Sequence, residues 1–90
     1  MAFLLNGVTT PTSSSASTTG VGSDLMFTFR GTIGDGVVDI DLSNDGTNWF
    51  YTGAKFDSSD ITPKIVTTAV GQSYRARVSG KNFNVIVEVL

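Results

Sequence analysis

The sequence contains no cysteine and no histidine, and it contains only two prolines. Without cysteine the chain can form no disulfide bond and offers no thiolate to a metal ion. Without histidine it lacks the commonest protein metal ligand and the side chain that most often transfers protons at neutral pH. An enzyme built on this chain would have to use carboxylate groups, and we expect neither a metal site nor a cofactor.

Charged residues are also scarce, with six lysines and arginines against eight aspartates and glutamates and a net charge of −2. Binding to a nucleic-acid backbone requires a basic surface, so this balance argues against nucleic acid as a partner. The apolar run at the start, MAFLL, lacks the pattern of a signal peptide and is far shorter than the roughly 18 apolar residues of a membrane span. We therefore expect no membrane partner and synthesis in a cytoplasm.

A chain of 90 residues is expected to form one domain. A domain of this size buries only about 60 to 65 per cent of the surface that its unfolded chain exposes, so it is marginally stable alone. With disulfide bonds excluded, oligomerisation is the remaining way to add stability. We expect a homo-oligomer, most simply a small ring such as a trimer.

The first 22 residues differ in composition from the rest of the chain. Residues 9–19, TTPTSSSASTT, are almost entirely serine and threonine, and such a segment buries too little apolar surface to offset its ordering entropy. We predict a flexible arm over residues 1–22 with an apolar tip of Phe3, Leu4 and Leu5 that docks on a neighbouring subunit. The alternative is a frayed terminus, or a first edge strand followed by a loop.

From residue 23 onward, apolar and polar residues alternate with the period of a β-strand, and no window of ten or more residues shows a helical repeat. Short runs of this kind, separated by glycine, asparagine and aspartate, predict an all-β fold, an antiparallel β-sandwich of six to seven strands, over residues 23–90. Pro63 removes a hydrogen-bond donor and marks its run as an edge strand. The expected strands lie in DLMFTFRG, VVDIDLS, TNWFYTGAKF, ITPKIVTTAV, SYRARVSG and NFNVIVEVL.

Two details favour an immunoglobulin-like or similar sandwich. Tyr74 opens an alternating strand three residues after Gly71 and resembles the tyrosine corner of such folds, although an ordinary core position is the alternative. Asp39 and Asp41 lie two apart on one expected strand, as do Arg75 and Arg77 on another. If the two strands are neighbours, these residues form a cross-strand charge ladder, and the alternative is that the arginines bind carboxylates of a partner.

The segment DLSNDGTNWFY, residues 41–51, is the richest in functional groups. Its first half matches the start of an EF-hand loop, but Thr52 stands where the bidentate glutamate would be, which leaves a weak cation site of Asp41, Asp45 and Asp35 as the alternative to no metal site. It also resembles the Asp-box turn of sialidase-type propellers, one residue short, and Trp49 and Tyr51 on one face could stack a sugar ring. We favour a plain hairpin, because Asn44, Asp45 and Gly46 tolerate the backbone of a tight turn. In that interpretation Trp49 and Tyr51 follow the turn as core residues.

The hairpin GDGVVDIDLSNDGTNW, the strand YRARVSG and the final strand VIVEVL together resemble small virion structural proteins of tailed bacteriophages over about residues 25–90. The resemblance implies a capsid decoration (cement) protein that binds the major capsid protein or another virion protein, made in the host cytoplasm and located in the virion. A small neck or tail protein is the alternative within the same class.

The expected contact residues are apolar or basic side chains left over once the core is filled. Phe83, Val85, Val87 and Val89 supply the inner face of the last strand, which leaves Ile86 and Leu90 beside Glu88 on the outer face. We do not expect an enzyme, because catalysis by a carboxylate pair requires a cleft that a 90-residue sandwich has little room for. A carbohydrate-binding module using Trp49 and Tyr51 is the alternative function. The candidate contact residues are Phe3, Leu4, Leu5, Val37, Arg75, Arg77, Ile86 and Leu90.

Overall fold

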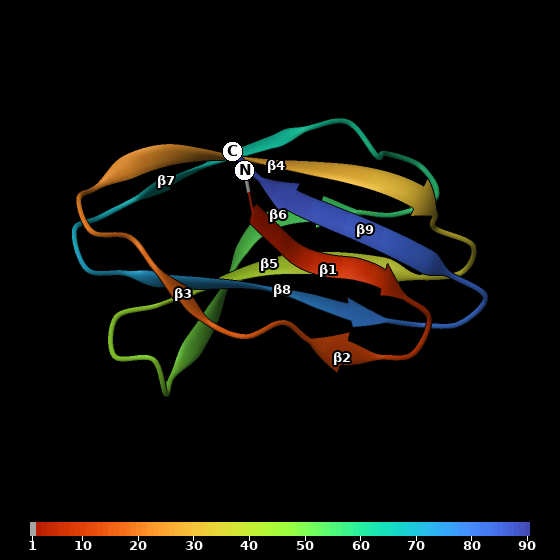
Figure 1. Cartoon of the computed structure of the whole chain (residues 1–90), viewed down its shortest axis with the longest axis horizontal. Coiled ribbons are helices and arrows are strands. Elements are labelled where there is room, and N and C mark those ends of the chain that lie inside the picture. The colour runs from red at the N-terminus through yellow and green to blue at the C-terminus, as the bar shows by residue number, and fades with distance from the viewer. Residues whose placement is uncertain (1) are drawn as a thin grey trace.

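The computed structural model describes residues 2–90 and contains only β-strands as regular secondary structure (Figure 1). The prediction of an antiparallel β-sandwich is confirmed. Within residues 2–90 there are nine strands, namely β1 (Ala2–Val8), β2 (Thr12–Ser13), β3 (Ser17–Thr18), β4 (Ser23–Thr32), β5 (Val37–Ser43), β6 (Trp49–Phe56), β7 (Lys64–Thr68), β8 (Ser73–Ser79) and β9 (Asn84–Val89).

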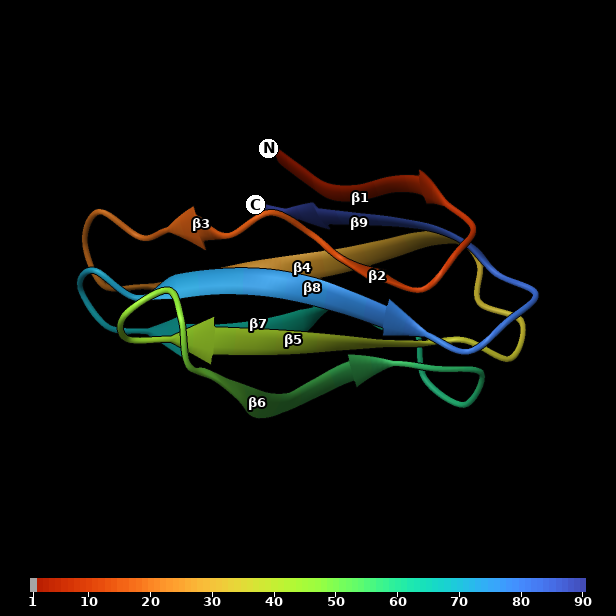
Figure 2. The same cartoon turned by 90° about the horizontal axis from the view of Figure 1, so that it is seen from below.

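The strands form two sheets that face each other (Figures 1 and 2). The first sheet, which we call sheet A, has the strand order β1-β9-β4-β7. The second, sheet B, has the order β2-β8-β5-β6, with β3 also paired to β8. All of these pairings are antiparallel. Each sheet therefore has an inner face toward the other sheet and an outer face toward solvent.

The core lies between the sheets and consists of apolar residues on the inner faces of the strands. Val38, Ile40 and Leu42 of β5 are buried, and so are Phe83 and the three inward valines of β9. Aromatic rings join the two layers, since Phe27 of β4 meets Tyr74 of β8 edge-on with 5.8 Å between ring centroids. Tyr74 thus has the ordinary core role that was the alternative to a tyrosine corner.

Residues 2–22 differ from the predicted flexible arm. β1 pairs with β9 along its length, and Leu5 is buried in the core of its own chain. The polar stretch is attached to β8 by the short strands β2 and β3 and by hydrogen bonds, including Ser14 N–H to the Ala76 carbonyl at 2.8 Å. Figure 2 shows this stretch crossing from sheet A to sheet B along one side of the sandwich. In this structure the segment completes the fold of its own chain.

The N-terminal segment also explains why the strand count exceeds the predicted six to seven. Residues 23–90 contribute six strands, β4 to β9, and the described part of the first 22 residues adds β1, β2 and β3. Serine and threonine hydroxyls take part in these attachments, as when the Thr19 hydroxyl donates to the Ala69 carbonyl at 2.9 Å. Free strand edges offer backbone groups to any extended segment, so a segment with few apolar side chains can still be held there.

Candidate functional site

The outer face of sheet B carries a network of charged side chains. Asp41 of β5 lies opposite Arg75 of β8, and Asp39 lies opposite Arg77, so the predicted cross-strand ladder forms. The Arg75 Nε atom is 3.0 Å from Asp41 Oδ2, and the Arg77 Nε atom is 3.1 Å from the same oxygen. A weaker contact of 3.4 Å joins Arg77 Nη1 to Asp39 Oδ2. The hydrogen bond from Arg77 to Asp41 raises the pKa of the Arg77 guanidinium.

Asp41 is the centre of this network. Although its side chain points to the outer face, the residue is only 2 % exposed because the two arginines cover it. The alternation along β5 places Asp41 on the outer face, but it does not show that residues of the neighbouring strand β8 bury it. Arg75 and Arg77, two of the candidate contact residues, are therefore engaged by carboxylates of their own chain.

Trp49 belongs to the same outer face and not to the core. It pairs with Ser43, and the neighbouring Tyr51 pairs with Asp41, whereas Phe50 pairs with the core residue Leu42. The Arg75 guanidinium carbon lies 4.3 Å from the centre of the Trp49 ring, which is a cation–π contact. The core role predicted for Trp49 and Tyr51 is thus wrong. Their position on one face agrees with the carbohydrate-binding alternative, which stays a prediction.

The segment DLSNDGTNWFY forms the β5–β6 hairpin, as predicted. The Asp45 carboxylate accepts hydrogen bonds from the backbone N–H groups of Thr47 and Asn48, both at 2.8 Å. The Asn48 side-chain amide and the Ser43 hydroxyl donate to the same carboxylate. Gly46 takes a positive φ of 76° in the turn. The side chains of Ser43, Asp45 and Asn48 are therefore used to fold the turn.

The Asp45 turn predicts an acid-sensitive part of the stability. Hydrogen bonds from the backbone of Asn48, then from that of Thr47, hold the pKa of Asp45 well below its usual range. Because the folded-state pKa is below the unfolded one, this stabilisation is present above about pH 4 and is lost as the pH falls further. We expect the wild type to lose more stability than Asp45→Asn between about pH 5 and pH 2.5, as measured by urea unfolding. Equal losses would contradict this account.

The outer face of sheet A carries apolar side chains. Met26 of β4 pairs with Ile65 of β7, and the Leu90 N–H donates to the Met26 carbonyl at 2.9 Å, so these three residues form a row across three strands. Leu90, Met26 and Ile65 are 55 %, 36 % and 64 % exposed, and Phe3 of β1 on the same face is 52 % exposed. We call these four residues the apolar patch. An exposed apolar cluster of this kind is a candidate surface for contact with another molecule.

The patch contains some of the predicted contact residues and omits others. Phe3 and Leu90 lie in the patch. Ile86 lies on the same outer face of β9, but it is half-buried and is not part of the patch. Leu4 is half-buried against the core, and Val37 is half-buried at the start of β5. The contact role predicted for Leu5 is wrong in this structure, because its side chain fills the core beneath β1. Met26 and Ile65 were not singled out from the sequence.

A buried carboxylate lies under the outer face of sheet A. Glu88 pairs with Phe3 on one side and Thr28 on the other and is 5 % exposed. The Arg30 Nε atom donates to Glu88 Oε1 at 2.9 Å, so the charge of this carboxylate is compensated on the face itself. The area around Phe3 and Thr28 is therefore close to neutral, although a glutamate lies at its centre.

The edges of both sheets are poorly suited to adding another strand. The register of β1 on β9 is irregular at two points, and β6 has a bulge opposite Ile40, where Gly53 has a φ of 89°. β2 and β3 have two residues each. β7 is an edge strand, as predicted, with five residues directly after Pro63. Bulges, prolines and short strands are the usual protection against edge-to-edge pairing.

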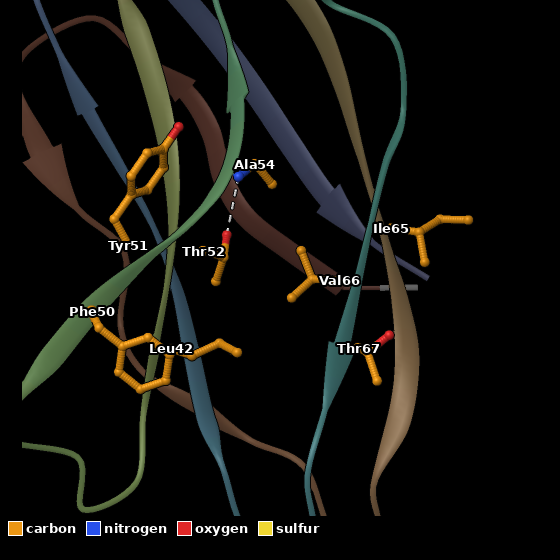
Figure 3. Close-up of a pocket in the computed structure, with 8 residues that line it drawn as sticks. All are labelled: Leu42, Phe50, Tyr51, Thr52, Ala54, Ile65, Val66 and Thr67. Atoms are coloured by element: carbon orange, nitrogen blue, oxygen red, sulfur yellow. Dashed lines mark hydrogen bonds between the residues drawn. The ribbon is translucent and has the colours of Figure 1, made fainter.

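A groove of about 400 Å³ lies between β6 and β7 (Figure 3). Phe50 and Leu42 line it from the side of sheet B, while Val66 points into it from β7 and Ile65 points away. Phe50 is exposed although it occupies an inward-facing position of its strand. The groove exists because the two sheets do not close over β6 on this side, whereas residues 2–18 cover the opposite side.

Comparisons with protein-family models, curated proteins and solved structures found no match to this chain. Among residues 2–90 there is no group of three or more acidic, histidine or cysteine side chains placed to hold a metal ion. The same residues include no helix that is long and apolar enough to cross a membrane.

Proposed function

We propose that this protein is a non-enzymatic structural protein that acts through protein–protein contacts. The apolar patch on the outer face of sheet A is the observation that carries the proposal, because it presents Phe3, Met26, Ile65 and Leu90 to solvent on a rigid sheet. Covering such a surface gains free energy at about 25 cal/mol for each square ångström of apolar area. The bulged and shortened sheet edges favour contact through a face over contact through an edge.

The virion of a tailed bacteriophage is the proposed location, and a capsid decoration protein bound to the major capsid protein is the proposed role. This part rests on the resemblance of residues 25–90 to small virion structural proteins. The Arg30–Glu88 pair is consistent with a contact through the apolar patch, because it leaves Glu88 without an uncompensated charge beside the patch. A protein that binds only the assembled lattice adds stability to it by mass action. A neck or tail position is the alternative within this proposal.

A surface variant tests the proposal on particles of the virus that encodes the chain. We expect Ile65→Lys to lower binding to purified particles at least about tenfold, because a charge would be placed in the apolar contact. Val70→Lys is the matched control, since Val70 is 73 % exposed against 64 % for Ile65 but lies in the turn after β7, away from the patch. Co-sedimentation with particles measures both. Equal binding by the two variants would contradict a role for the patch.

A further inference from the structure

The outer face of sheet A has a charged residue of β4 toward each end, with an apolar row and the buried Glu88 between them. Asp24, Met26, Thr28 and Arg30 alternate along β4 and share the outer face, since Leu25, Phe27 and Phe29 point inward. Asp24 is exposed at one end of the face, where it accepts a hydrogen bond from the Thr67 hydroxyl. The Arg30 side chain stands near the other end. Its Nε and Nη2 atoms bind Glu88, and because the side chain is 63 % exposed, its remaining N–H donors can reach a partner. Six residues of extended chain place Asp24 and Arg30 about 20 Å apart. The row of Leu90, Met26 and Ile65 lies between the two charges.

We propose that this face binds the same face of a second copy of the chain across a two-fold axis. The axis lies in the interface, perpendicular to β4 and near Phe27. Rotation about it reverses the direction of β4, so that Asp24 of each copy meets Arg30 of its partner, and the contact is made twice. A contact of one surface patch with itself is the commonest interface of homo-oligomers.

The apolar residues also fit this arrangement. The rotation sets the row of Leu90, Met26 and Ile65 beside the partner's Phe3 and Thr28, which form the next row along the sheet. Glu88 in that next row is already bound by Arg30 of its own chain, so it presents no free charge to the apolar row. Two sheets that pack face to face stand about 10 Å apart, a distance at which side chains of this size interdigitate.

The size of the face predicts a weak dimer. Four strands at about 4.8 Å spacing and about 20 Å of strand length give roughly 400 Å² for each partner. Stable interfaces bury about 800 Å² on each side, so we expect a dissociation constant between about 10 and 300 µM. This inference rests on the proposed function in taking the patch as a contact surface, and it proposes a two-fold pair in place of the three-fold ring expected from the sequence. Pairing and lattice binding use the same face, so a copy bound to the lattice through the patch is unpaired. Below the expected dissociation constant the chain is a monomer, and its patch is then free to bind the lattice.

Sedimentation velocity over about 5 to 500 µM protein tests the inference, a range that brackets the expected dissociation constant. We expect the wild type to change from monomer to dimer with rising concentration. Asp24→Lys places like charges at both ends of the contact and should raise the dissociation constant at least about tenfold. Arg30→Glu should do the same, and an equimolar mixture of the two variants should dimerise again, because each copy then meets an opposite charge.

Arg30→Glu also removes the cation that compensates Glu88, so this variant could unfold. It is used only if its circular-dichroism melting curve shows a folded domain. If it is not folded, a double-mutant cycle of Asp24→Asn and Arg30→Gln replaces the mixture, with a coupling of at least about threefold in the dissociation constant expected. A wild type that stays monomeric at about 500 µM, a trimer, an unaffected Asp24→Lys variant, or a mixture or cycle without coupling would overturn the inference.

The outcomes separate the inference from the proposed function. A monomeric wild type whose particle binding is lost in Ile65→Lys would overturn the self-pairing and leave the structural role in place, with the lattice as the partner of the patch. A wild type that dimerises as described, but does not bind particles, would support the self-pairing and contradict the proposed role in the virion.

Discussion

Replacing Gly34 by alanine is expected to cost the domain more than about 3 kcal/mol of unfolding free energy. Gly34 has a positive φ of 53°, and a Cβ atom there would lie 1.9 Å from the carbonyl oxygen of Asn82. That oxygen belongs to the backbone of the β8–β9 loop, which is held to the same turn by the Asp35 N–H to Lys81 carbonyl bond of 3.1 Å. Neither loop can move without breaking this contact. Urea unfolding of wild type and variant measures the loss.

Gly46→Ala is the matched control for the Gly34 prediction. Gly46 also has a positive φ, 76°, but a Cβ atom at this position would meet nothing within 4 Å. Only the backbone preference of a non-glycine residue is lost there, which costs about 1 to 2 kcal/mol. If the two variants lose the same amount, the close approach of the 33–36 turn to the 80–83 loop is not what requires glycine at residue 34.

Replacing Asp41 by asparagine is expected to cost about 2 to 3 kcal/mol. The change keeps the shape of the side chain and removes the only charge that lies between Arg75 and Arg77 at 3.0 and 3.1 Å. Breaking a buried ion pair from one side costs about 3 to 5 kcal/mol because the remaining charge is left without compensation. The expected loss is smaller because water reaches the two arginine side chains, which are 23 % and 39 % exposed. Thermal and urea unfolding at pH 7 give the value.

Asp39→Asn is the control for Asp41, since it makes the same chemical change two residues away on the same face. The Asp39 side chain is 17 % exposed and makes one ion pair, at 3.4 Å, with Arg77. We expect this variant to lose less than about 1 kcal/mol. A larger loss for Asp39→Asn than for Asp41→Asn would show that the network is not centred on Asp41.

The sequence alone was sufficient for most of the sandwich over residues 23–90. Alternation divides the side chains of a strand between two opposite faces. In β5 one of these faces is entirely apolar, and it is the inner face, with Val38, Ile40 and Leu42. The same reasoning misplaced Trp49 because β6 has large apolar residues on both faces, and a period of two does not say which face is inside. The pairing with β5 decides it, since Phe50 lies opposite Leu42.

The N-terminal segment could not be placed from its composition. A run of serine and threonine predicts little burial, and the structure agrees that most of residues 9–19 are exposed. Order there comes from backbone and hydroxyl hydrogen bonds to β8, such as the bond from the Ala76 N–H to the Ser14 hydroxyl at 3.0 Å. Such bonds can form only where a strand edge is free. The free edge is set by the order of the strands in the sheet, and this order cannot be read from the sequence of the segment.

The apolar patch was only partly visible in the sequence. Leu90 stood out as an apolar residue near Glu88 on the outer face of the last strand, and Phe3 stood out as part of the apolar tip that precedes the serine and threonine run. Met26 and Ile65 did not stand out, because the outer face of each of their strands is not apolar by itself. The patch arises from the register that sets Met26 opposite Ile65 and next to Leu90, so three strands distant in sequence supply one surface. The burial of Asp41 was missed for the same reason, because two residues of another strand bury it.

Binding to purified particles is the measurement that decides whether the apolar patch makes this protein an assembly component, as we propose. We expect the wild type to bind saturably at a fixed ratio to the capsid subunits, Val70→Lys to retain binding, and Ile65→Lys to lose at least about tenfold. Wild-type protein that does not bind particles, or an Ile65→Lys variant that binds as well as the wild type while remaining folded, would contradict it.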